Sequence, residues 1–203
     1  MPRKIDLDVQ RRMVADAAIT VIGEAGVEGA GLREVARAAK LTTGAVTHYF
    51  DGKDAVLEAA LNEIVRRTLA RIESGQDGQG VWSVQEFIDR ACRHLPLDAA
   101  GRKEWRVWLA FWGRAIADGR LRTINKRYYA AIVDQTVGSL QRVVGIDASM
   151  TPEELRKRAD AVIAAIDGIG VRATLDPASW SARRQRETLE RLLLPMLLPP
   201  KSN

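Results

Sequence analysis

The sequence predicts an all-α protein of about nine helices, in which a small N-terminal helix-turn-helix head precedes a larger helical body. Apolar residues recur at spacings of three and four along the chain, and alternation with a period of two is nearly absent. Hydrophobic residues make up 46% of the 203 residues and charged residues 28%, which is enough apolar surface for a packed core. We expect the head to span residues 1–53 and the body residues 54–203.

The predicted head contains one long helix and two short ones. Apolar residues from Met13 to Ala25 form the first stripe, which Gly26 ends, and a stripe of only two turns follows from Leu32 to Ala39. A second short helix is expected from Thr43 to Tyr49, with the Thr42 hydroxyl as its N-cap. Helices this short are unstable alone, because nucleation costs more than a few hydrogen bonds return. Both therefore have to pack on the first helix, as in a helix-turn-helix.

Longer helices follow in the body. The stripe from Val56 to Ile72 predicts an amphipathic helix of roughly twenty residues, and glycines at 75, 78 and 80 predict a loop after it. Thr151, Pro152 and Glu154 indicate a strong helix start: an N-cap hydroxyl, a proline at the first helical position and a glutamate three residues after the cap. The other expected helices lie near residues 83–95, 102–118, 120–144, 152–174 and 179–196.

The residue content argues against an enzyme, a metal site and a cofactor site. The single cysteine, Cys92, and His94 lie two residues apart, hence on different helix faces, and we expect a buried thiol and a surface imidazole. Gly75, Gly78 and Gly80 lack the preceding strand that a dinucleotide-binding fold requires. The sequence contains no HExxH, GxSxG or P-loop pattern.

Neither end of the chain predicts an export signal or a membrane span. The first ten residues are charged and lack an apolar segment. The run from Leu192 to Leu198 contains Pro195 and is far shorter than the ~20 residues that a span needs. We therefore expect a cytoplasmic protein that binds no membrane.

The second short helix has the properties of a helix that enters the major groove of DNA. At ~1.5 Å per residue it is about 10 Å long, and the groove is about 12 Å wide. It carries hydroxyl, methyl, imidazole and phenol groups and no acid that would repel phosphate. The candidate contact residues are Thr43, Gly44, Ala45, Thr47, His48 and Tyr49, with Arg33 and Lys53 as candidate phosphate contacts. The alternative is a packed helical hairpin with a polar surface.

The net charge of +5 adds little to this argument. The first 53 residues carry eight basic and seven acidic side chains, so the head is almost neutral. A nucleic-acid interface therefore has to be argued from where the charges lie.

Three stretches of the head form a long compound motif: Leu32-Arg-Glu-Val-Ala-Arg-Ala-Ala39, Leu41-Thr-Thr-Gly-Ala-Val-Thr-His-Tyr-Phe50, and Lys53-Asp54 with Leu57. Over residues 9–60 the chain resembles the DNA-binding head of the TetR (tetracycline-repressor) family. The resemblance implies that one set of side chains faces DNA, with Ala45 against base edges, and that Val46 and Phe50 hold the head together. The implied DNA-facing residues are Thr42, Thr43, Thr47, His48, Tyr49 and Lys53.

Three positions depart from the family pattern. Gly31 stands where Thr or Ser usually caps the first short helix, Thr47 stands where Tyr is frequent, and Lys40 stands where Gly is common. The last two change groove-facing or turn chemistry, so they leave the operator sequence open and do not affect the expectation of DNA binding.

One expected body helix carries three of the five tryptophans on one face. Trp105, Trp108 and Trp112 follow the i, i+3, i+7 spacing, and Leu109 and Ile116 fall on the same side. The simpler interpretation is a core stripe.

The other interpretation is an aromatic-lined cavity, to which Phe111, Tyr128 and Tyr129 would contribute. Such a cavity suits a flat apolar molecule or a cation over the ring faces. Glu104-Trp-Arg-Val-Trp-Leu-Ala-Phe-Trp112, and less specifically Asp167-Gly-Ile-Gly-Val-Arg172, resemble the effector-binding body of the BetI-type (choline/betaine-regulator) members. The resemblance implies a small-molecule effector, aromatic or cationic.

The last two expected helices combine small residues with leucines. The residues concerned are Ala161, Ala164, Ala165, Gly168, Ala173, Leu189, Leu192, Leu193 and Met196. They predict a surface that meets its twofold mate in a four-helix bundle, and an intramolecular core is the alternative. A homodimer could read two half-sites of a palindromic operator about 34 Å apart, which would supply the specificity that one short helix lacks.

Taken together, these features predict a homodimeric, ligand-responsive DNA-binding regulator, a repressor that its effector releases from the operator by shifting the helix near 53–73. An activator on the same fold is one alternative. A helical small-molecule-binding protein or enzyme with a vestigial head is another.

Overall fold

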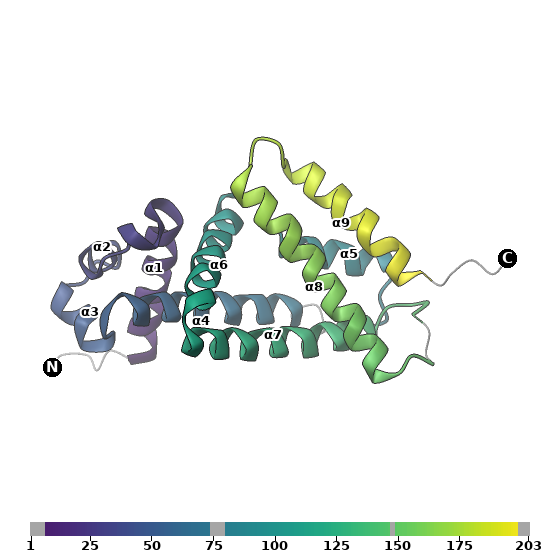
Figure 1. The fold of residues 1–203 in the computed structure, drawn as a ribbon, viewed down its shortest axis with the longest axis horizontal. Helices are drawn as coiled ribbons and strands as arrows, with labels where there is room; N and C mark the ends of the chain where they lie inside the picture. The colour runs from purple at the N-terminus through teal and green to yellow at the C-terminus, as the bar shows by residue number, and fades with distance from the viewer. Residues whose placement is uncertain (1–6, 74–79, 147–148, 199–203) are drawn as a thin grey trace. The chain divides into compact units, whose positions relative to one another are not determined.

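The computed structural model describes residues 7–73, 80–146 and 149–198 (Figure 1). These residues form nine helices and no strand beyond an isolated bridge, which confirms the predicted all-α class. The helices are α1 (Leu7–Gly29), α2 (Leu32–Ala38), α3 (Thr43–Tyr49), α4 (Gly52–Glu73), α5 (Val84–Cys92), α6 (Ala99–Ala117), α7 (Gly119–Leu140), α8 (Pro152–Leu175) and α9 (Ala182–Leu197). The predicted loop glycines at 75 and 78 lie outside the described residues.

Packing divides the chain into two compact units. Of the described residues, the first unit contains 7–67 and 102–123, and the second contains 68–73, 80–101, 124–146 and 149–198. Most of α6 thus packs with the head helices, although residues 68–101 separate it in sequence from the part of α4 that belongs to this unit. The boundary after residue 53 divides the chain by expected function, into a DNA-binding head and a body, and it stays a prediction.

In the first unit, α2 packs against α1 and α3 against α2 (Figure 1). Gly26 has a φ of 72° and interrupts the helical backbone of α1, at the position where the sequence predicts the helix to end. The core of this unit contains small and branched side chains, including Val14, Ala18, Ile22, Val35, Ala36, Val46, Leu57 and Leu61.

An ionic cluster joins α1, α4 and α6 within the first unit. The Arg67 guanidinium pairs with Asp16 on α1, with Glu63 at 2.9 Å on its own helix and with Glu104 at 3.5 Å on α6. Glu63 is buried, and hydrogen bonds from Arg66 and Arg67 hold the pKa of its carboxyl below the ordinary value despite burial. The cluster therefore links α6 to both α1 and α4.

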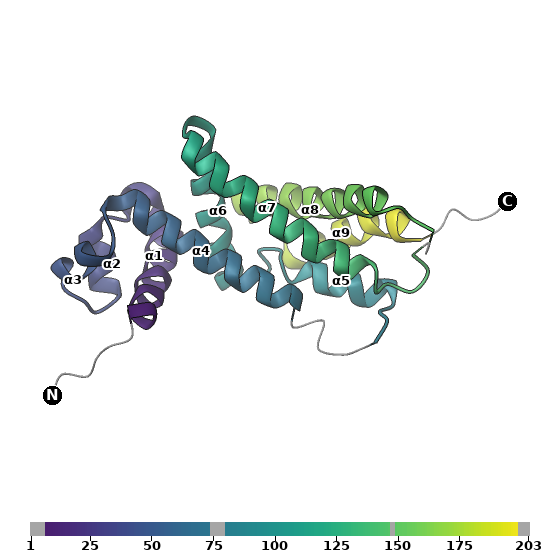
Figure 2. The same cartoon turned by 90° about the horizontal axis from the view of Figure 1, so that it is seen from below.

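In the second unit, α9 packs against both α8 and α5, and Figure 2 shows these helices from a second side. The predicted start of α8 is confirmed: Pro152 is in its first turn, and Thr151 and Glu154 form a reciprocal capping box. Trp82 pairs with Val143 in the isolated bridge, and α7 ends at Leu140 instead of the predicted 144.

Two cores of this unit are built around buried tryptophans. Arg90 and Arg142 lie 4.4 and 5.0 Å from the ring centroid of Trp82. Trp180 likewise has Arg172 and Arg184 at 4.8 and 4.7 Å. Both rings are already covered by cations of the chain itself, so they serve packing.

The expectation of a buried Cys92 thiol is confirmed, and the expectation of a surface His94 imidazole is wrong. Cys92 is buried, and burial raises the pKa of its thiol. His94 is half-buried instead of exposed; desolvation, with Arg71 and Arg93 nearby, lowers its pKa to about 4.

In the ranges that the structure describes, no helix is long and apolar enough to cross a membrane.

Candidate functional site

The turn before α3 positions that helix on the head. Leu41 N donates to Ala36 O at 2.9 Å, and Lys40 has a φ of 57°, the only non-glycine residue with a left-handed backbone in the described part of the chain. Side chains are strained in this region and glycine is not, which explains why glycine is common there in the resembling family. Thr42 then caps α3: its Oγ1 accepts a hydrogen bond from Ala45 N at 3.2 Å, as predicted.

The helix α3 turns nearly all of its side chains outward. Val46 is fully buried and is the only buried residue of the seven, while Ala45 and Tyr49 are half-buried. The exposed residues are Thr43, Gly44, Thr47 and His48. Phe50 is buried directly after the helix, so Val46 and Phe50 anchor α3 as expected.

The polar groups of α3 are not equally free to contact a ligand. The Thr47 hydroxyl donates to Gly44 O at 3.1 Å and remains exposed. The Tyr49 hydroxyl donates to Gln10 Oε1 on α1, so this phenol also holds α3 on α1. The His48 ring meets the Tyr49 ring edge-on, with centroids 5.1 Å apart.

The two candidate phosphate contacts also differ. Arg33 is exposed in the first turn of α2. Lys53 is exposed at the start of α4, but its Nζ donates to Glu28 O at 2.9 Å and lies 3.9 Å from the Glu28 carboxylate. A phosphate contact by Lys53 would therefore replace or share this link to α1.

The tryptophans of α6 form a cluster in the first unit. The Trp112 ring lies 6.0 Å from Trp105, edge-on, and 5.8 Å from Trp108. Trp105 is buried, and Trp108 and Trp112 are half-buried. Ile116, expected on the same side, is 77% exposed because this face is no longer covered at the last turn of α6.

The other predicted aromatic residues have separate surroundings. Phe111 is fully buried in the first unit. Tyr128 belongs to the second unit, where its ring is buried and the Arg127 guanidinium lies 5.5 Å from its centroid.

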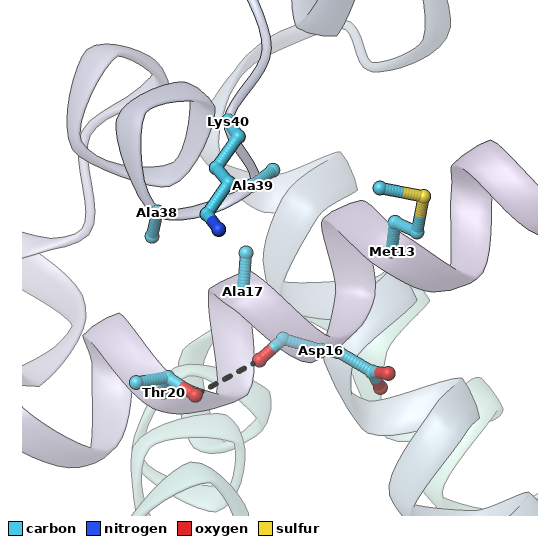
Figure 3. Close-up of a pocket in the computed structure, with 7 residues that line it drawn as sticks. All are labelled: Met13, Asp16, Ala17, Thr20, Ala38, Ala39 and Lys40. Carbon is cyan, nitrogen blue, oxygen red and sulfur yellow. Dashed lines mark hydrogen bonds between the residues drawn. The ribbon is translucent and has the colours of Figure 1, made fainter.

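A hollow of about 370 Å³ lies in the head between α1 and the turn after α2 (Figure 3). It is lined by Met13, Asp16, Ala17, Thr20, Ala38, Ala39 and Lys40. None of the predicted effector residues belongs to this lining.

The second unit contains a polar pair that the sequence does not reveal as a pair. The Tyr129 hydroxyl on α7 donates to Asp167 Oδ2 on α8 at 2.6 Å, and both side chains are half-buried. An acid among the apolar residues in the middle of α8 is the signal that could have marked Asp167 for attention.

Two family models match the chain. Residues 14–60 match the model described as bacterial regulatory proteins, tetR family, and residues 90–198 match the model for the C-terminal part of BetI-type transcriptional repressors. The second match alone covers more than half of the chain. The chain belongs to the TetR family. It is a transcriptional regulator with a TetR-type DNA-binding head and a BetI-type C-terminal region, as the resemblance predicted.

Individual TetR-family relatives agree over nearly the whole length. The chain is 25% identical over 187 residues to the HTH-type transcriptional regulator BetI of Vibrio atlanticus, covering 92% of this chain and 90% of that protein. It is 25% identical over 179 residues to BetI of Escherichia coli K12, covering 86% and 87%.

Solved structures of transcriptional regulators share the fold. A transcriptional regulator from Rhodococcus sp. Rha1 is 30% identical, covers 92% of this chain and 95% of its own, and has a TM-score of 0.77. A regulator from Saccharomonospora viridis, solved in complex with choline, is 19% identical with a TM-score of 0.76, covering 92% and 96%.

The surface predicted for dimerisation is partly exposed in the single chain. The exposed residues are Ala161, Ala164, Gly168 and Leu192, the last at 47%. Ala173, Leu189 and Leu193 are buried inside the second unit instead, where α9 packs on both α8 and α5.

Proposed function

We propose that this TetR-family chain is a homodimeric repressor that binds a palindromic operator through α3 and that a small-molecule effector lowers its operator affinity. The observation that carries the proposal is the outward presentation of α3, with Val46 as its only buried residue and no acidic side chain. Thr43, Ala45 and Thr47 are the base-contacting candidates, and Arg33 is a phosphate contact.

Footprinting the purified dimer across the genome would identify the operator, and anisotropy titrations with that operator would test α3. Thr47→Ala is expected to weaken binding about tenfold, in line with the ~1–3 kcal/mol of a good base contact. Thr123→Ala is the matched control, because Thr123 is also an exposed helical threonine whose hydroxyl bonds back to its own helix, to Gly119 O at 3.0 Å. Equal operator affinity in the two variants would count against α3 as the reading helix.

The effector half of the proposal is supported by the α6 cluster and its connections. Trp108 and Trp112 present partly accessible rings, and Lys103 on the same helix pairs with Glu24 of α1 at 2.7 Å. Arg114 pairs with Asp54 of α4. A ligand that displaces α6 would therefore move both α1 and α4, and a few kcal/mol of differential binding is enough to empty an operator.

Choline, the ligand of the Saccharomonospora viridis regulator, is a rational first probe. Effector binding should change the tryptophan fluorescence of the protein and weaken operator binding in the same titration. If bound and free dimers hold the operator equally for every metabolite tried, the ligand-responsive half fails and DNA binding stands.

The dimer is proposed to form through α8 and α9. Ala164 and Gly168 leave an exposed strip without bulky side chains on α8, and Leu192 adds apolar surface on α9. Ala164→Glu should shift the protein to monomer in analytical ultracentrifugation, whereas Glu153→Ala, at the exposed start of the same helix, should not.

A transcriptional regulator acts where its operator is. We therefore infer a cytoplasmic protein without catalytic activity.

A further inference from the structure

The second unit contains a carboxylate without a counter-charge. Asp167 on α8 is half-buried, accepts the 2.6 Å hydrogen bond from Tyr129 and takes part in no ion pair among the described residues. Desolvation raises the pKa of the Asp167 carboxyl to about 6, although the hydrogen bond from Tyr129 acts in the opposite direction. The surroundings of this carboxylate thus favour a positive charge that can reach it.

A second acceptor lies on the same side of α7. Asn125 precedes Tyr129 by four residues, which places the two side chains as neighbours on one helix face. The Asn125 Oδ1 atom is buried and has no hydrogen-bond partner in the part of the chain that the structure describes. A buried acceptor that lacks a donor has lost its hydrogen bonds to water without replacement, so Asn125 Oδ1 calls for a donor from a ligand.

The two observations ask for complementary properties in one ligand. Asp167 lacks a positive charge, and Asn125 lacks a hydrogen-bond donor. An ammonium group that carries N–H bonds supplies both. A quaternary ammonium supplies charge without a donor, and the negative charge of a carboxylate ligand would be repelled by Asp167. A divalent cation usually takes several carboxylates, and only one is present here.

We propose that Asn125, Tyr129 and Asp167 of the second unit form a subsite that binds a protonated primary or secondary amine. This inference rests on the proposed function in one respect, that the chain binds a small-molecule effector. It differs from it in selecting amines with N–H donors over their quaternary counterparts.

The test is isothermal titration calorimetry of the full-length dimer, without DNA, with matched probes. Each of three amines (phenethylamine, butylamine and spermidine) is compared with its fully N-methylated, quaternary counterpart, and phenethylamine also with phenethyl alcohol. At least one amine should bind ten times or more tightly than its quaternary partner. Asp167→Asn should weaken that amine at least tenfold. Asp160→Asn, an exposed aspartate of the same helix, should leave its affinity unchanged.

Several results would overturn the subsite. These are quaternary probes that bind as tightly as the amines, an Asp167→Asn variant that keeps full amine affinity, and no amine binding at millimolar concentration. A Mg²⁺ titration that competes with the amine would reassign the site to a metal ion and also overturn it.

Folding and the proposed function are checked separately. Circular dichroism and operator anisotropy of Asp167→Asn should match the unsubstituted protein. If the subsite variant has lost both its fold and its operator binding, Tyr129→Phe is the replacement, because it removes only the hydroxyl that orients Asp167 and should still weaken the amine severalfold. If the unsubstituted protein binds no operator, the proposed regulatory function is wrong, and the amine subsite is unaffected.

Discussion

The starts of α3 and α8 use the same cap with one difference. A threonine hydroxyl accepts a backbone N–H at both, from Ala45 N at 3.2 Å and from Glu154 N at 3.3 Å. At α8 the Glu154 carboxylate also accepts from Thr151 N at 2.7 Å, which completes a capping box. At α3 the equivalent third position is Ala45, so the box is open.

The absence of an acid from the first turn of α3 agrees with the proposed contact between α3 and DNA. A carboxylate in the first turn stabilises a helix through its hydrogen bond and through the helix dipole. The first turn of α3 has no acid, although α3 is shorter than α8 and buries only Val46. The stabilising acid is absent from the start of α3, where phosphates would approach in the proposed complex. It is present at the start of α8, where they would not.

The largest expected effect is on operator binding, from a substitution that completes a capping box at the start of α3. Ala45→Glu should weaken operator binding about 100-fold, because like charges at an interface cost several kcal/mol. Its free energy of unfolding should stay equal or rise by about 0.5 kcal/mol. Operator anisotropy and urea denaturation measure the two quantities. Ala45→Gln is the control, since it offers the same hydrogen bond without charge and should bind more tightly than the glutamate variant.

Acidification tests the unit that contains α8. The folded pKa of His94, about 4, lies below its ordinary 6.5, so the unfolded chain takes up more protons in between. The His94 contribution to the free energy of unfolding should therefore fall by about 1–2 kcal/mol from pH 7 to pH 5. Asp167, whose pKa is raised to about 6, contributes with the opposite sign over the same range.

The His94→Gln variant separates these two contributions. Urea denaturation at pH 7 and pH 5 gives the free energy of unfolding of both proteins. Between these pH values the unsubstituted protein should lose about 1–2 kcal/mol more than the variant, because every titrating group except His94 is present in both. Parallel losses in both proteins would mean that His94 titrates normally.

Removing the two cap hydroxyls should separate the helices by function. Thr42→Ala and Thr151→Ala should each lower the free energy of unfolding by about 1 kcal/mol. Only Thr42→Ala should also weaken operator binding, because it loosens α3. Operator binding that responds equally to both substitutions would break the contrast between the two helices.

The smallest effect is expected at the turn that leads into α3. Lys40→Gly should raise the free energy of unfolding by about 0.5–1 kcal/mol, because glycine adopts the left-handed backbone without strain. Thermal melts measure the gain. Lys40→Asn controls for the lost charge, since asparagine tolerates this conformation better than lysine does. A lower Tm in both variants would show that contacts of the Lys40 side chain stabilise the fold by more than relief of its backbone strain does.

Local features of this chain were predictable from sequence because they depend on neighbouring residues. The Thr42 cap, the Thr151–Glu154 box and the Gly26 interruption are examples. The resemblance to the TetR head also placed Val46 and Phe50 correctly in the core.

Features that depend on which helices meet were not predictable. The pairing of Tyr129 with Asp167 joins residues 38 apart, and the half-burial of His94 depends on the packing of the second unit. The end of α7 at Leu140 is similar, because Val143 leaves the helix to pair with Trp82. The DNA-contacting and effector-contacting roles depend on partners that the chain itself does not contain.

The grouping of α6 with the head bears on how regulators of this type can be recombined. A synthetic chimera made by one cut after residue 53 would leave Asp16 and Glu24 of α1 without their partners, Arg67 on α4 and Lys103 on α6. A transplant has to carry residues 102–123 as a second, separate insert, so the exchangeable module is discontinuous in sequence.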